Sequence, residues 1–126
     1  MEVKVIHLIH ELINWFLPIV SKYPRNFRYT LGTRLEEHLF HLLENCILAQ
    51  YSKKKVYYLN KANMNIELSR HFIRISHTQK IITVKQYEAF SRQLHQIGKQ
   101  VGGWKKESEK KTCEGSWDKL TLVSND

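Results

Sequence analysis

The sequence predicts an all-α fold, an up-down-up-down antiparallel four-helix bundle. Four segments, each of about 20 to 26 residues, place apolar side chains at every third or fourth position, the period of a helix with one buried face. Short connections separate these segments, and short connections make consecutive helices antiparallel neighbours. No internal repeat or low-complexity segment in the sequence suggests another architecture.

The first helix is predicted over residues 3–22. Pro18 lies inside its apolar pattern, and because proline lacks an amide hydrogen we expect a lost hydrogen bond and a bend near Asn14. Pro24 then opens the second helix, residues 25–50, at a position where the missing N–H does no harm. The apolar seam of the second helix steps by three or four residues through Leu31, Leu35, Leu39, Leu42, Cys46 and Ala49.

The third helix is predicted over residues 52–76, with Ser52 as its N-cap. It carries two apolar stripes, so it is either deeply buried or also in contact with another subunit, and both interpretations stay open. The first stripe consists of Leu59, Ala62, Ile66, Ser69 and Ile73, and the second of Met64, Leu68, Phe72 and Ile75.

The fourth helix is predicted over residues 83–104. Thr83 and Gln86 have the spacing of a capping box, and apolar residues continue at helical spacing as far as Trp104. The periodicity stops there. We therefore expect the bundle to occupy residues 1–104 and a charged, flexible tail to occupy residues 105–126.

Glycines inside the predicted helices need a physical reason, because glycine in a helix is about 1 kcal/mol less stable than alanine. Gly32, Gly98, Gly102 and Gly103 lie in such positions. Close approach of a neighbouring backbone is one explanation. A helix C-cap is another, and it applies only to Gly102 or Gly103.

Length and composition indicate one soluble domain. A chain of 126 residues can bury a single core. No apolar run approaches the roughly 20 residues of a membrane span, and the N-terminus lacks the pattern of a signal peptide, so we expect a cytoplasmic protein without a membrane partner. The two cysteines, Cys46 and Cys113, have no pattern of a disulfide framework or a zinc site.

The charge balance points to the partner. Twenty Lys and Arg against twelve Asp and Glu give a net charge of +8. Such a field favours a polyanion, with nucleic acid ahead of an anionic membrane. A basic protein that is merely soluble is the alternative.

Basic residues gather where two of the predicted helices begin. Cations near a helix N-terminus oppose the helix dipole by a few tenths of a kcal/mol each, and an anionic ligand would relieve that cost. The two groups are Arg25, Arg28 and Arg34 in the second helix and Lys53, Lys54 and Lys55 in the third.

Arg70 and Arg74 form a third candidate site, one turn apart on one face of the third helix. Their planar guanidinium groups suit phosphate recognition. The only acid between Ile66 and Lys85 is Glu67, which favours an external anion over neutralisation by neighbouring glutamates. We therefore predict contact with nucleic acid or a partner protein at this pair.

Signatures of catalysis are absent from the sequence. It has no glycine-rich phosphate loop, no nucleophile elbow and no paired carboxylates beside a tuned base. The histidine pairs His7/His10 and His38/His41 share helix faces, but the Glu-x-x-His motif of a di-metal bundle does not occur. We expect no enzyme activity, no metal and no cofactor.

Two strings carry a family resemblance. YPRNFRYTLG at residues 23–32, with Arg34, Leu35 and Glu36, resembles the start of the second helix in the accessory variability determinant (Avd) proteins of diversity-generating retroelements. Gln86-Tyr87, Ile97-Gly98 and the run from Val101 to Trp104 resemble that family's C-terminal signature. The resemblance covers about residues 10–104.

This resemblance implies a four-helix bundle that assembles into a pentameric barrel with a basic surface. It also implies binding to reverse transcriptase and to template RNA or cDNA, in support of mutagenic copying, with Arg70 and Arg74 at positions of partner or nucleic-acid contact. A sister family, encoded in intervening sequences of bacterial ribosomal-RNA genes, shares the bundle. Membership there would imply an RNA-binding or protein-interaction module instead.

Overall fold

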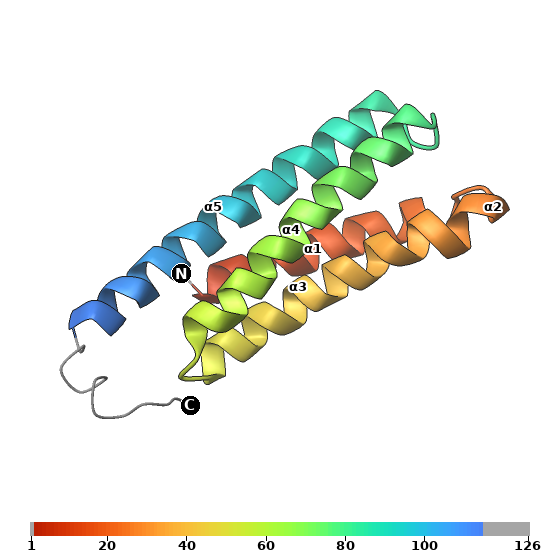
Figure 1. Cartoon of the computed structure of the whole chain (residues 1–126). Coiled ribbons are helices and arrows are strands. Elements are labelled where there is room, and N and C mark those ends of the chain that lie inside the picture. Colours follow the sequence, from red (N-terminus) through yellow and green to blue (C-terminus); the bar gives the residue numbers. More distant parts are fainter. Residues whose placement is uncertain (1, 115–126) are drawn as a thin grey trace.

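The protein is an antiparallel four-helix bundle, as the sequence predicts (Figure 1). The computed structural model describes residues 2–114, and the side chains of residues 4–111. No strand occurs within these residues. The elements are α1 (Glu2–Val20), α2 (Arg25–Phe27), the π-helical turn η1 (Arg28–Gly32), α3 (Thr33–Tyr51), α4 (Lys55–Thr78) and α5 (Val84–Glu114).

The four long helices pack as a closed ring around one core. Each lies beside two others, in the order α1, α3, α4, α5 and back to α1. Phe16 of α1 meets Phe90 of α5 edge to face, with ring centroids 5.1 Å apart. The expected seam of the second helix and the first stripe of the third are buried, and so is Trp104. Burial of these apolar faces is the main force that holds the helices together.

The second apolar stripe of the third helix lies outside this core. Met64 and Ile75 are exposed, and Phe72 is partly buried against the ring of His38 in α3, at a centroid distance of 5.5 Å. The interpretation of a helix buried on all sides is therefore wrong for the single chain. The outer face of α4 therefore exposes apolar side chains among polar ones such as Lys61 and His71.

One buried polar pair sets how α3 and α4 align. The Asn45 amide donates a hydrogen bond of 2.8 Å to the side-chain oxygen of Asn65, and both residues are buried. Sliding either helix would leave both amides without partners in an apolar layer, which is costly. The pair therefore selects one register of the two helices.

The second predicted helix is interrupted near its start. Residues 28–32 form a π-helical turn, in which the Thr33 N–H bonds to the carbonyl of Arg28, five residues back. Leu31 and Gly32 are buried in this turn. A Cβ on Gly32 would lie only 3.0 Å from Val20 Cγ2 of α1. Glycine is thus favoured here by a close approach, although a side chain rather than a backbone makes it.

The beginning of α4 also differs from the prediction. Ser52 is not its N-cap, because Ser52 takes an extended conformation that ends α3, and its hydroxyl accepts the Lys54 N–H at 2.9 Å. The Ser52 hydroxyl thus bonds to the backbone two residues later, inside the connection, and α4 starts at Lys55. The capping box of α5 is confirmed, since Thr83 and Gln86 exchange hydrogen bonds of 3.0 Å each.

The predicted end of the fourth helix at Trp104 is wrong, because α5 continues to Glu114. Figure 1 shows this last part extending past the ends of the neighbouring helices. Lysine and glutamate are good helix formers, and Lys111 pairs with Glu107 at 3.5 Å, so this part needs no apolar period. The C-cap at Gly102 or Gly103 is therefore also wrong. The remainder of the expected tail, residues 115–126, lies outside the described residues.

Removing one half of the asparagine pair should destabilise the bundle more than removing both. Asn45→Ala leaves the Asn65 amide buried and unpaired, so we expect a loss of about 1–3 kcal/mol in unfolding free energy. Replacing both residues by leucine removes the unpaired groups and should recover most of that loss. Urea unfolding of the single and double variants measures both effects. Equal destabilisation of Asn45→Ala and the double leucine variant would contradict the register role.

Candidate nucleic-acid interface

The structure distributes the predicted basic residues over three places. Arg25, Arg28 and Arg34 lie at the end of the bundle where α2 and the turn between α4 and α5 are found (Figure 1). The run from Lys53 to Lys55 lies at the opposite end of α4. These ends are about 36 Å apart, because α4 has 24 residues that rise 1.5 Å each. The arginines at the start of the second predicted helix and the lysine run therefore do not form one site.

One end of the bundle is poor in acidic residues. Neither residues 12–35 nor residues 68–87 contain an aspartate or glutamate. The buried hydrogen bond of 2.8 Å from the Tyr23 hydroxyl to Ser76 Oγ brings these two segments together. We use the name basic end for the lysines and arginines of these two segments that lie at this end of the bundle. They are Lys22, Arg25, Arg28, Arg34, Arg74, Lys80 and Lys85.

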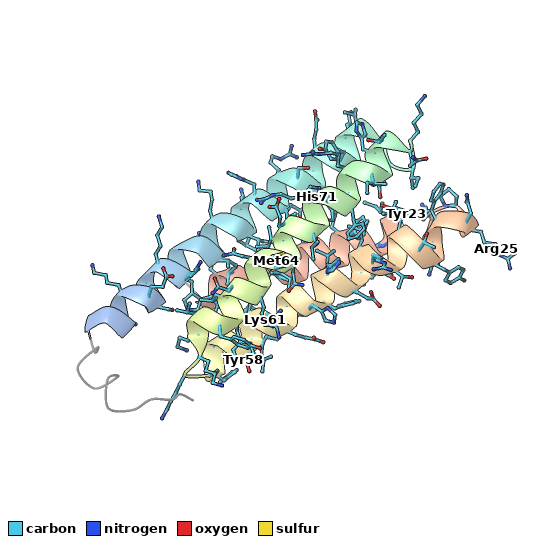
Figure 2. All side chains as sticks on the ribbon, viewed as in Figure 1. Tyr23, Arg25, Tyr58, Lys61, Met64 and His71 are labelled. Atoms are coloured by element: carbon cyan, nitrogen blue, oxygen red, sulfur yellow. The ribbon has the colours of Figure 1, made fainter. Side chains whose placement is uncertain are left out.

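The cations of the basic end lack internal counter-charges. Within the described residues, none of them forms an ion pair with a carboxylate, and all except the half-buried Arg28 are exposed. Figure 2 shows the Arg25 side chain extending away from the bundle. A surface of this kind attracts an anion by its summed field and releases bound counterions when phosphate replaces them.

Two of these cations are held by the backbone around them. The Arg28 guanidinium donates to the carbonyl of Val20 at 3.3 Å and lies 6.0 Å from the centroid of the Tyr29 ring. Lys80 has a φ of 60°, a left-handed conformation that favours glycine or asparagine. The turn after α4 thus has a lysine at a position where glycine or asparagine is more common.

Sequence reasoning from helix N-termini missed Lys22, Lys80 and Lys85. The signal that could have found them is the absence of acids over residues 12–35 and 68–87, since this pattern does not depend on the helix boundaries. The predicted up-down-up-down topology already places both segments at the same end of the bundle. The contact between Tyr23 and Ser76 confirms that they meet.

Arg70 has a partner inside the protein. Its Nη1 lies 3.2 Å from a Glu67 carboxylate oxygen, and its side chain passes close to α5, where a Cβ on Gly98 would lie 3.3 Å from Nη2. Gly98 therefore makes room for an arginine rather than for a neighbouring backbone. Arg74 is exposed and has no such partner among the described residues. The two arginines, expected to be equivalent, differ in their surroundings.

An open notch surrounds Arg70 between α4 and α5. It has a volume of about 410 Å³. Its lining mixes cations with Glu67, so its charge is weaker than that of the basic end. The residues that line it are Asn63, Ile66, Glu67, Arg70, His95, Gly98 and Lys99.

The lysine run is partly used by the fold. The Lys55 ammonium donates to the carbonyls of Ala49 at 2.8 Å and Gln50 at 3.0 Å, at the C-terminus of α3. A cation there stabilises α3 and offsets its unfavourable position at the start of α4. Lys53 and Lys54 are exposed. Lys55 thus has a structural role that its sequence position did not predict.

The histidines do not contribute a metal site. Within the described residues, no group of three or more His, Cys, Asp or Glu side chains could hold a metal ion. Burial against Phe72 lowers the pKa of His38, and the neighbouring His41 and Arg34 lower it further, against an opposing effect of Glu37. Neutral His38 adds no charge to the surface. No helix in residues 2–114 has the length and apolarity to cross a membrane.

Comparison with known proteins agrees with the resemblance seen in the sequence. A family model described as bAvd-like matches residues 4–108, which is most of the chain. No curated protein and no solved structure matches. The sequence resembles two families, and the family that matches is the Avd family.

Replacing Arg70 and Arg74 by alanine should separate binding from folding. Arg70 loses only an exposed ion pair with Glu67, so the unfolding free energy should change by less than about 1 kcal/mol. Affinity for nucleic acid should fall by tenfold or more if these guanidinium groups contact phosphate. Thermal melting and a binding titration measure the two effects.

The matched control removes two other charges. Lys106→Ala with Lys110→Ala has the same net charge as the arginine variant, and these exposed lysines lie beside Glu107 and Glu109. This control should bind nearly as well as the unchanged protein. An arginine variant that melts far below it while the folded fraction binds normally would make Arg70 and Arg74 structural residues.

Proposed function

The chain belongs to the bAvd-like family, and on that premise we propose that it holds the reverse transcriptase and the nucleic acid of a diversity-generating retroelement together. Members of this family are bacterial Avd proteins, which are generally non-catalytic accessory proteins of such elements. Membership therefore implies association with the retroelement system. The specific partners are part of the proposal: reverse transcriptase, and template RNA or cDNA during mutagenic retrohoming.

The observation that carries the nucleic-acid part is the basic end. Its cations face no carboxylate within the described residues, and an extended polyanion supplies the missing negative charge. The mechanism is electrostatic, since Lys and Arg displace condensed counterions from phosphates. No set of side chains arranged to read base edges is evident among the described residues, so we assign sequence selection to the partner or to RNA shape.

We also propose that the protein is a homo-oligomer. Exposed apolar side chains recur at helical spacing on two helices and support this part, although exposed polar residues lie among them. We call these two rows the apolar stripes. Met64, labelled in Figure 2, is 57% exposed in the middle of one of them. The stripe on α3 contains Phe40, Ile47 and Tyr51, and the stripe on α4 contains Tyr57, Met64 and Ile75.

Two different stripes on one chain suit a head-to-tail contact, in which α3 of one copy meets α4 of the next. Contacts of this type close into a ring when the rotation between copies is a whole fraction of a turn. The resemblance to the Avd family implies a ring of five. The basic end lies at the ends of the helices and would remain accessible in such a ring.

Binding to RNA and DNA should weaken steeply with salt. Because the proposed contacts are to phosphates, a plot of log affinity against log salt concentration should fall with a slope near −0.9 per phosphate contacted for duplex DNA. Fluorescence anisotropy between about 50 and 200 mM salt measures it. Arg25→Ala should make the slope less steep by about one contact, whereas Lys106→Ala should not. A slope near zero would contradict the electrostatic mechanism.

The purified protein should have a mass near five times 15.1 kDa by light scattering. Met64→Glu should lower this mass, because a carboxylate would be buried without a partner in the proposed contact. Gln96→Glu adds the same charge at an exposed position of α5 and should leave the mass unchanged. A stable monomer would rule out the proposed assembly.

A further inference from the structure

Tyr29 is the most exposed aromatic side chain at the basic end. Its ring is 73% exposed, although it lies between the half-buried Arg28 and the buried Leu31. Tyr29 belongs to the π-helical turn, whose buried residues are Leu31 and Gly32, and it lies on the outside of that turn. Turns of this type are uncommon and occur often at functional sites.

The surroundings of Tyr29 distinguish it from an isolated surface tyrosine, which would need no explanation. Arg25 and Arg28 flank it in the sequence, and no acid occurs from residue 12 to residue 35. Arg28 is already fixed by its bond to the Val20 carbonyl at 3.3 Å. A guanidinium group has five N–H donors, so Arg28 retains donors for a phosphate.

We propose that Tyr29 stacks on an unpaired base of single-stranded nucleic acid while Arg25 and Arg28 bind the adjacent phosphates. This inference rests on the proposed nucleic-acid function and specifies its ligand. An exposed ring flanked by cations is the arrangement that binds single strands without regard to sequence, because every base presents a flat face. A base inside a duplex has both faces covered, so the ring selects unpaired strands.

The opposite end of the bundle has aromatic and basic residues too, but their use differs. Tyr57 has both the Lys61 ammonium 5.2 Å from its ring centroid and the Tyr58 ring 5.0 Å away (Tyr58 and Lys61 are labelled in Figure 2). Tyr29 has the Arg28 guanidinium at 6.0 Å and no neighbouring ring among the described residues. Tyr51 is 81% exposed and continues the apolar stripe of α3, which we assign to the subunit contact. The exposed tyrosines at this end are therefore less suited to bind a base than Tyr29.

The test compares Tyr29→Ala and the control Tyr29→Phe with the unchanged protein. The probes are fluorescein-labelled oligouridine and oligothymidine of about 12 nucleotides, within the range of known single-strand sites, and a duplex of equal length. Tyr29→Ala should weaken binding to both single strands by about 5- to 150-fold, the effect of losing one base–aromatic stack. Duplex affinity and the salt dependence should stay unchanged, because no charge is removed.

Tyr29→Phe should bind as the unchanged protein does, since it keeps the ring. A 2-aminopurine base in the oligothymidine reports stacking directly. Its fluorescence should fall on binding to the unchanged protein and to Tyr29→Phe, and should not fall with Tyr29→Ala. Melting curves should coincide, because the ring is exposed.

The outcomes separate this inference from the proposed function. If the unchanged protein binds no nucleic acid at low salt, the proposed function is wrong, and the proposed stacking by Tyr29 is wrong as well. If Tyr29→Ala binds single strands normally, or loses duplex and single strands equally, the stacking is wrong while the general binding stands. If Tyr29→Ala keeps nucleic acid but loses the reverse transcriptase in a pull-down, the ring contacts the protein partner and the inference is overturned.

Discussion

The junction of α1, the π-helical turn and α4 has to hold together two segments that carry charge of one sign. Lysines and arginines on residues 12–35 and 68–87 repel each other, and no carboxylate lies in either segment to offset this. Buried contacts provide the compensation. The Tyr23 ring packs edge to face against Phe16 at 6.2 Å, its hydroxyl bonds to Ser76, and Gly32 lies against Val20. Burial raises the pKa of Tyr23, so its hydroxyl stays protonated as a donor.

This arrangement separates two kinds of surface. Acidic residues occur on the bodies of the helices, where Glu11, Glu67 and Glu107 each form exposed ion pairs. Exposed pairs of this kind contribute little to stability. They do limit the positive field along the bundle, whereas the basic end has no such partners. At physiological salt a charge is screened beyond about 8 Å, so cations spread along the whole bundle would act singly, while a group at one end acts together.

The apolar stripes run along α3 and α4 and meet the basic end only around Ile75 and Arg74, so assembly would leave most of the basic end accessible. In a ring whose axis runs along the helices, rotational symmetry places every basic end on the same side. Five such ends would form one continuous cationic surface, along which a single strand could contact several subunits. Linked sites of this kind bind more tightly than any one site alone, because later contacts are intramolecular.

The sequence by itself determined the helices and the faces they bury, because helical periodicity and capping are local properties. The seam through Leu35, Leu39 and Leu42 and the capping box at Thr83 are found as predicted. It could not place the π-helical turn, which depends on the approach of Val20 to Gly32, nor the helical part after Trp104, which has no apolar period. Which basic residues remain free for a ligand likewise depends on the tertiary structure. Lys55 is occupied by carbonyls of α3 and Arg70 by Glu67, because the neighbouring helix and the side-chain conformations decide which cations find partners. The predicted topology brings Lys22 and Lys80 to the same end as Arg25, and the bond from Tyr23 to Ser76, 53 residues away along the chain, fixes how the segments meet.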